Sequence, residues 1–279
     1  MNTKVNAASF SFTAPERNQG ANIRADKFPS PYTAVEHTLE DHTFMTTVEK
    51  DFSGYHIFFL HGGGCVMEAV SFHADVVKKL ADQGHRVTVF DYPLAPEHQF
   101  EKIQESVYNA YQELKKLYPQ DLFAVYGDSS GGGLGLALLM RLRDEGCQTR
   151  PKKAVWVSPA VDLTMSNPEI QKYRSIDRSL NFEGSIAAGK AYIGDADPHD
   201  PRISPLYGNL EDLGEMLLFY GENELLRPDC ELFAQKVEKS SGSKIQAFMG
   251  QNMYHDYLMM VSFPESVKAF ETIQTFLKK

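Results

Sequence analysis

Long apolar runs are missing from this 279-residue chain, whose uninterrupted apolar stretches, such as residues 57–60, extend over only a handful of positions. A membrane-spanning helix needs about 20 apolar residues, so we expect no membrane-spanning segment and no membrane partner. The first residues, 1–4, also lack the apolar segment of a signal peptide. These absences together predict a cytoplasmic protein.

Cysteine is scarce as well. The chain has three cysteines, Cys65, Cys147 and Cys230, which are an odd number and lie far apart in the sequence. Such a set indicates reduced thiols in a reducing compartment rather than a disulfide framework. No Cys-x-x-Cys pair is present, so we expect no structural zinc site.

The chain has no excess of basic residues. Lys and Arg number 28 against 37 Asp and Glu, which gives a net charge of −9. A nucleic-acid-binding surface needs a basic patch, so we expect no nucleic-acid partner. Hydrophobic residues make up 42% and charged residues 23%, which is close to an ordinary folded domain and excludes a disordered chain.

Short apolar segments alternate with amphipathic ones over most of the chain. This alternation predicts an α/β fold with a mostly parallel central sheet flanked by helices, because right-handed crossovers join parallel strands. We expect one domain over residues 1–279. The expected strands are 35–39, 43–48, 55–60, 86–90, 122–126, 153–157, 216–220 and 244–249. The expected helices are 71–83, 101–117, 132–142, 182–193, 229–239 and 264–277.

Two stretches interrupt the alternation. Residues 1–33 are polar and irregular, and residues 160–205 contain several prolines around one modest helical piece. Ligands of parallel sheets bind at the carboxyl ends of the strands. We therefore expect these two stretches to form a small lid at that edge.

Residues 127–131, Gly-Asp-Ser-Ser-Gly, form a G-x-S-x-G pattern between an expected strand and an expected helix. A serine nucleophile needs such a sharp turn to project its hydroxyl above the sheet, and the flanking glycines leave room for the turn. A chance glycine-serine turn is the alternative, but the strand before and the helix after favour Ser129 as a nucleophile. No phosphate-binding Gly-Lys-Ser/Thr or dinucleotide-binding pattern is present.

Residues 61–64, His-Gly-Gly-Gly, directly follow another expected strand. Consecutive glycines can aim backbone N–H groups at the negative oxygen of a tetrahedral intermediate. We assign Gly62 and Gly63 to this oxyanion hole, completed by the N–H of Ser130. We expect His61 to orient the loop by hydrogen bonds, and a merely flexible glycine loop is the alternative.

The chain resembles the hormone-sensitive-lipase-like branch of the α/β-hydrolase fold, the small bacterial esterases. Three segments carry the resemblance in the order and near the spacing of that family: residues 61–64, residues 91–98 (Asp-Tyr-Pro-Leu-Ala-Pro-Glu-His) and residues 127–132. The likeness extends from about residue 35 onward. Cys65 stands where the family usually has an aromatic residue, and Ser130 where it usually has alanine, which bears on the shape of the acyl pocket.

In this fold the catalytic residues follow the order serine, acid, histidine. Only His199 and His255 follow Ser129 in the sequence. His199 lies in the inserted stretch, whereas His255 follows the last expected strand, where a loop can reach the carboxyl edge of the sheet. We therefore assign His255 as the base.

The acid should follow the expected strand 216–220, where Glu222, Glu224 and Asp229 are the candidates. The resemblance selects Glu224, because the family places its acid three residues after a glycine, here Gly221, and before a leucine-containing turn. Glu222 is the second choice. We expect Asp229 to cap the next helix, since a proline precedes it.

The resemblance implies hydrolysis of short-acyl carboxylic esters, acetyl to about hexanoyl, without a cofactor or metal. It also suggests that His61, Cys65 and Asp128 lie close to the substrate. Two alternatives remain: an amidase or arylformamidase on the same site, and a binding protein that has lost catalysis. The sequence does not reveal whether the chain forms a homodimer.

Overall fold

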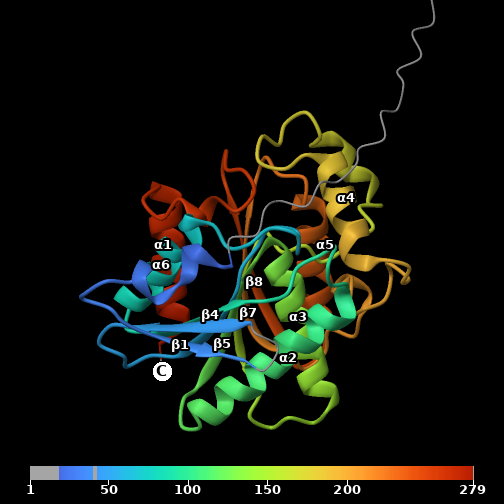
Figure 1. Ribbon diagram of the computed structural model, residues 1–279. Coiled ribbons are helices and arrows are strands. Elements are labelled where there is room, and N and C mark those ends of the chain that lie inside the picture. The colour runs from blue at the N-terminus through green and yellow to red at the C-terminus, as the bar shows by residue number, and fades with distance from the viewer. Residues whose placement is uncertain (1–18, 40–42, 279) are drawn as a thin grey trace, which may run out of the picture.

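The computed structural model describes residues 19–39 and 43–278. Its centre is an eight-stranded sheet in the order β1-β2-β4-β3-β5-β6-β7-β8 (Figure 1). The first two neighbouring pairs, β1–β2 and β2–β4, are antiparallel, and all the others are parallel. The expected α/β fold with a mostly parallel sheet is confirmed. The strands are β1 Thr33–Thr38, β2 Phe44–Glu49, β3 His56–Leu60, β4 Arg86–Asp91, β5 Phe123–Asp128, β6 Lys153–Val157, β7 Gly214–Gly221 and β8 Ser243–Gly250.

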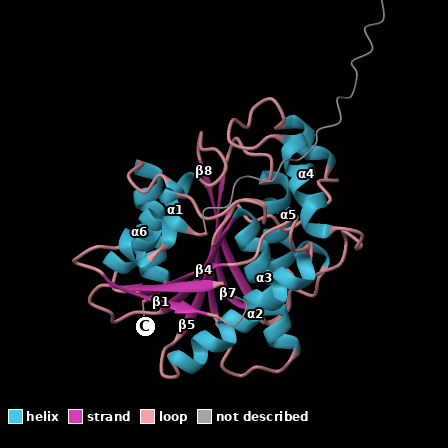
Figure 2. Ribbon diagram, viewed as in Figure 1, coloured by secondary structure: helices cyan, strands magenta, loops and turns pink. Residues whose placement is uncertain are grey.

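Helices cover both faces of the sheet (Figure 2). One face carries α1 Ser71–Asp82 and α6 Pro264–Phe276, and the other carries α2 Phe100–Leu117, α3 Ser129–Asp144 and α5 Arg227–Glu238. Side chains alternate across a strand, so in β3 Ile57 and Phe59 join the core with α1 and α6, while Phe58 and Leu60 join that with α2 and α3. Burial on both faces explains why the central strands are continuously apolar.

The carboxyl ends of the parallel strands meet at one edge of the sheet. The glycine loop follows β3 there, Ser129 follows β5, Ser158 follows β6 and the loop that contains Glu224 follows β7. The turn that contains His255 follows β8. All the elements of the expected site therefore converge at one edge, although they are far apart in the sequence.

The stretch 160–205 folds over this edge and contains α4, Phe182–Ile193, which Figure 1 shows beyond the sheet near α5. The other expected lid element behaves differently. Residues 1–18 lie outside the described residues. The part from Gln19 packs against α1 and the segment before it: Ile23 is buried, and Asn22 Nδ2 donates to Ala69 O at 2.9 Å. None of residues 19–33 lines the cavity described below.

Two local predictions were wrong. Helix α3 begins at Ser129 and not at residue 132, because the turn at Ser129 passes directly into the helix. Asp229 is not an N-cap: α5 begins at Arg227, and Asp229 lies in its first turn, buried, with Oδ1 accepting from Asn167 Nδ2 at 2.8 Å. Among the described residues, no helix has the length and apolar character needed to cross a membrane.

Candidate active site

Ser129 occupies a strained turn between β5 and α3. Its φ of 48° lies in the left-handed region, which is costly for a residue with a side chain and recurs at functional sites. The flanking glycines make the turn possible. A Cβ on Gly127 would lie 2.5 Å from the carbonyl oxygen of Gly131, and a Cβ on Gly131 would collide with the carbonyl oxygen of Leu60. The G-x-S-x-G pattern is thus explained by close backbone packing on both sides of the serine.

His255 reaches Ser129 from the turn after β8. Its Nε2 lies 3.0 Å from Ser129 Oγ, although the two residues are 126 positions apart in the sequence. The side chain of His255 is buried, with 6% of its surface exposed. The serine and the histidine selected from the sequence are therefore within hydrogen-bonding distance, as a nucleophile and its base must be.

Glu224 is fully buried below the histidine. Its Oε2 accepts from Ser158 Oγ at 2.7 Å and from the Gly221 N–H at 2.9 Å. Its Oε1 points toward His255 Nδ1 at 3.9 Å, and neither of these two atoms has another partner among the described residues. Catalytic hydrogen bonds are often this long without substrate and shorten in the complex. Glu222 instead accepts from the Asn252 N–H at 2.8 Å.

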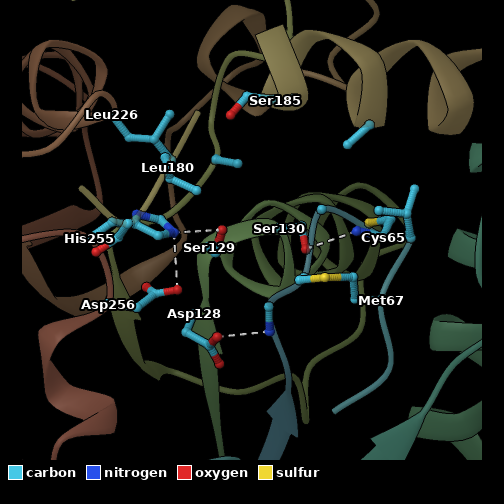
Figure 3. A pocket seen from close by; sticks show the side chains of 18 of the residues that line it. Cys65, Met67, Asp128, Ser129, Ser130, Leu180, Ser185, Leu226, His255 and Asp256 are labelled. Carbon is cyan, nitrogen blue, oxygen red and sulfur yellow. Dashed lines mark hydrogen bonds and ion pairs between the residues drawn. The ribbon is translucent and has the colours of Figure 1, made fainter. Parts of the chain in front are cut away.

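A second carboxylate, which the sequence analysis did not single out, lies at the same histidine. Asp256 Oδ2 is 3.0 Å from His255 Nε2, on the nitrogen that also faces Ser129 (Figure 3). Burial opposes the charged imidazole, but the charge and hydrogen bond of Asp256, aided by Glu224, raise the pKa of His255 well above 6.5. Burial in turn raises the pKa of Asp256 to about 6. In the sequence, only the position of Asp256 directly after His255 could have indicated that this carboxylate belongs to the site.

The glycine loop differs from expectation at Gly62. Its N–H donates to Asp128 Oδ2 at 2.8 Å, so a carboxylate already uses the donor that was assigned to an oxyanion. Gly63 and Gly64 follow with φ of 116° and 65°, and both line the cavity. The N–H of Ser130, in the first turn of α3, has no acceptor within the helix.

Asp128 and His61 support this loop from behind. His61 Nδ1 lies 2.7 Å from Gly62 O, and its ring stacks on Tyr92 with the centroids 4.3 Å apart. Burial lowers the pKa of His61 to about 3, so the ring is neutral. His61 does not line the cavity, which corrects the expectation that it lies close to the substrate. Asp128 lines the cavity and also contacts His73 Nε2 at 3.2 Å.

A cavity of about 580 Å³ opens above Ser129. Figure 3 shows Leu180 and Leu226 on the His255 side and Cys65 and Met67 on the side of the glycine loop. The 160–205 stretch supplies a large part of the wall, including Ala160, Leu163, Met165, Leu180, Ser185 and Ala188. Cys65 also lines the cavity, but burial raises its pKa to about 12, so its thiol stays protonated and is a poor nucleophile. The cavity is mostly apolar, with a few polar groups at its base.

In the part of the chain that the structure describes, no three His, Cys, Asp or Glu side chains are grouped as a metal ion would need. The site is built from a serine, a histidine and carboxylates next to a loop of backbone donors. Such an arrangement can perform nucleophilic acyl transfer with the side chains present.

Residues 57–259 match the model of a protein family described as having the alpha/beta hydrolase fold. The chain belongs to this α/β-hydrolase family. The matched range contains every residue of the site, from the glycine loop to Asp256. Solved structures place the hydrolase in the hormone-sensitive-lipase-like branch: it superposes on an esterase of the bacterial hormone-sensitive lipase family with a TM-score of 0.82 and 26% identity, covering 94% of this chain and 92% of the other.

Several relatives are similar in sequence as well. The hydrolase is 32% identical over 225 residues to an esterase of Acinetobacter venetianus, which covers 79% of this chain and 73% of the relative. It is 28% identical over 221 residues to the ethyl acetate hydrolase of Pseudomonas putida, covering 76% of this chain and 69% of the relative. It also shares 28% identity over 233 residues with an acetyl-hydrolase of Streptomyces hygroscopicus, covering 81% of this chain and 76% of the relative.

Proposed function

We propose that this hydrolase cleaves short-acyl carboxylic esters with Ser129 as nucleophile, His255 as general base and Glu224 as the orienting acid. The observation that carries the proposal is the 3.0 Å distance between Ser129 Oγ and His255 Nε2 at the base of a mostly apolar cavity. The ester-hydrolysing relatives named above support the same reaction class.

The reaction follows from these positions. His255 Nε2 takes the Ser129 proton as Oγ attacks the acyl carbonyl, and the imidazolium then returns this proton to the leaving alcohol. Glu224 holds Nδ1–H and stabilises the charge on the ring. Water, activated by His255 in the same way, then releases the acid and restores the serine.

The oxyanion donors in this proposal are the N–H groups of Gly63, Gly64 and Ser130. Gly62 is left out because its N–H is donated to Asp128, whose carboxylate would also repel a negative oxygen. Asp128 then has a structural task, since it fixes the loop next to the nucleophile. One such donor contributes about 3 kcal/mol to the transition state.

The short acyl group in this proposal is supported by relatives whose names specify acetyl esters, an acetyl-hydrolase and an ethyl acetate hydrolase. The cavity volume of about 580 Å³ is within the usual range for small-molecule sites, and the 160–205 stretch, which we take to act as a lid, limits the extent of the cavity. The cavity accommodates acyl chains from acetyl to about hexanoyl, and the acetyl-ester relatives favour these chains over those of a long-chain lipase substrate.

Ser129→Ala tests the proposal. It should lower kcat for p-nitrophenyl acetate by at least about 10⁴-fold, because the proposed acyl-enzyme forms on Ser129 Oγ. Ser185→Ala is the matched control, since it removes another hydroxyl of the cavity wall, one that donates to Asn181 O at the start of α4, and it should retain most of the activity. Turnover by Ser129→Ala at the wild-type rate would overturn the assignment.

A substrate series tests the specificity. The kcat/KM should be higher for p-nitrophenyl acetate, butyrate and hexanoate than for the decanoate, and an acetanilide should be a poor substrate. Faster cleavage of the anilide or of aryl formamides than of the esters would favour the amidase alternative. Faster cleavage of the decanoate would exclude the short-acyl preference.

A further inference from the structure

We propose that Asp256 is a positioning residue of the reaction, which competes with Ser129 for Nε2 of His255. The inference rests on the proposed roles of Ser129 and His255. It adds a second carboxylate to the site, on the opposite ring nitrogen from the orienting acid.

The geometry separates the two carboxylates. Asp256 Oδ2 and Ser129 Oγ both lie 3.0 Å from Nε2, whereas Glu224 Oε1 faces Nδ1 (Figure 3). Asp256 therefore cannot hold the Nδ1 proton, as the acid of a triad does. It faces the nitrogen that must accept the serine proton.

The backbone holds Asp256 in this place. Its φ of 54° is left-handed, and its N–H donates to Ser158 Oγ at 3.1 Å. The same hydroxyl donates to Glu224 Oε2, so Ser158 links the positions of both carboxylates. Asp256 Oδ1 is buried and has no hydrogen-bond partner among the described residues, so no other contact draws the carboxyl away from the histidine.

The shared nitrogen limits which protonation states of His255 can activate Ser129. An ionised Asp256 carboxylate at 3.0 Å from Nε2 requires a proton on that nitrogen. Because Glu224 holds the Nδ1 proton in the proposed reaction, the ring is then an imidazolium, and it cannot accept the proton of Ser129. If the ring is neutral with its proton on Nδ1, Asp256 itself must carry the proton, and its O–H then occupies the Nε2 lone pair. In both cases one proton lies between Asp256 and His255. It must leave to solvent before Ser129 can be activated.

Several neighbours act on this shared proton. The pKa of Asp256 responds to the charges of Asp128, Glu224 and His255. The charge of Asp256 in turn raises the pKa of three groups on neighbouring elements: His73 of α1, Tyr126 of β5 and Cys230 of α5. The nearby carboxylates of Asp128 and Glu224 favour retention of the proton, as does burial of Asp256. The pair should therefore lose its proton at a higher pH than an isolated histidine.

The pH dependence of kcat/KM on p-nitrophenyl acetate tests the inference. In Asp256→Asn the midpoint of the acidic limb should fall by about one unit or more relative to wild type, because the opposite charge next to the imidazolium is removed. With each profile normalised to its own plateau, the variant should be about tenfold more active at a pH well below both midpoints. Asparagine tolerates the left-handed backbone, so the turn should be kept.

Asp162→Asn is the matched control. Asp162 also lines the cavity, but its carboxylate accepts from the Thr164 N–H and the Tyr207 hydroxyl and does not contact His255. Its acidic midpoint should stay at the wild-type value. An unchanged midpoint in Asp256→Asn, or an equal shift in Asp162→Asn, would overturn the inference.

A second measurement does not need turnover. The His255 ring can be titrated by NMR in the Ser129→Ala background, with and without Asp256→Asn. The added substitution should lower the midpoint of His255 by about one unit or more, and an identical midpoint would contradict the inference. A wild-type protein that cleaves no ester would overturn the proposed function alone, because this titration still reports the Asp256–His255 pair.

Discussion

At the residue scale, the site concentrates buried polar groups and backbone strain in a few positions. Ser129 and Ser158 have φ of 48° and 44°, and each follows a strand of the parallel sheet. Ser158 bonds Glu224, and Ser129 faces His255. The strain is held by close packing, which fixes the direction of each side chain before a substrate arrives.

The two candidate acids can be separated by amide substitution. Glu224→Gln should reduce kcat for p-nitrophenyl acetate by on the order of 10³–10⁴-fold, because the amide removes the charge that stabilises the imidazolium. Glu222→Gln should stay within a few-fold of wild type, since the Glu222 carboxylate accepts from the backbone N–H of Asn252, whereas Glu224 faces Nδ1 of His255. The opposite order of the two effects would move the acid to Glu222.

Gly131, two residues after Ser129, should not tolerate a methyl side chain. Gly131→Ala should lower the free energy of unfolding by about 1–3 kcal/mol, because its Cβ meets the carbonyl of Leu60. Urea denaturation measures this change. Gly184→Ala in α4 is the control: its nearest neighbour would be 3.4 Å away, so alanine should be neutral or slightly stabilising. Equal losses in both variants would refute the packing argument.

At the element scale, one buried carboxylate joins the 160–205 stretch to the loop that contains Glu224. Asp177 Oδ1 accepts from the N–H groups of Ser179 and Leu180 at 2.8 and 3.0 Å, and Oδ2 accepts from that of Leu225 at 2.8 Å. Leu180 lines the cavity and Leu225 follows Glu224. The wall of the pocket and the proposed catalytic acid thus share an anchor.

Removing this anchor should affect both stability and catalysis. Asp177→Ala leaves three N–H groups without their acceptor and should cost about 1–3 kcal/mol in unfolding free energy. The kcat/KM for p-nitrophenyl butyrate should fall as well, because Leu180 and Glu224 lose a common support. Asp195→Ala, at an exposed carboxylate next to α4, should change stability by less than about 0.5 kcal/mol. Full activity in Asp177→Ala would show that the two segments are positioned independently.

At the scale of the whole molecule, buried carboxylates make folding depend on pH. Burial raises the pKa of Asp229 to about 6, with the nearby Asp162 adding to the effect and the Asn167 hydrogen bond opposing it. A carboxyl with a raised pKa binds more protons in the folded than in the unfolded state between about pH 4 and 6. The stability that involves Asp229 therefore falls as the pH rises through this window.

Asp229→Asn should remove this dependence. The amide keeps an oxygen for Asn167 Nδ2 but has no charge to bury, so the variant should be more stable than wild type at pH 8, by on the order of 2–3 kcal/mol. The difference should vanish below about pH 4. Urea unfolding at several pH values measures it, and a constant difference across this range would contradict the assignment of the titration to Asp229.

Much of the architecture could be predicted from the sequence, because strands, helices and sharp turns depend on local periodicity and on a few special residues. The short apolar runs of the central strands, the amphipathic face of α2 and the left-handed Gly84 after α1 (φ 85°) are local signals of this kind. The G-x-S-x-G turn belongs with them, because its glycines are required by the turn itself. The boundaries were less accurate, as at the start of α3, where packing overrides the low helix propensity of glycine.

Only the tertiary structure decided which group each polar atom meets. Asp128 takes the N–H of Gly62, His61 lies behind the loop, Asp229 is buried inside a helical turn, and Asp256 faces Nε2 of His255. The sequence supplied these residues and the order of the elements that carry them. It could not supply the directions of their side chains, because these depend on contacts between segments that come together only when the sheet assembles.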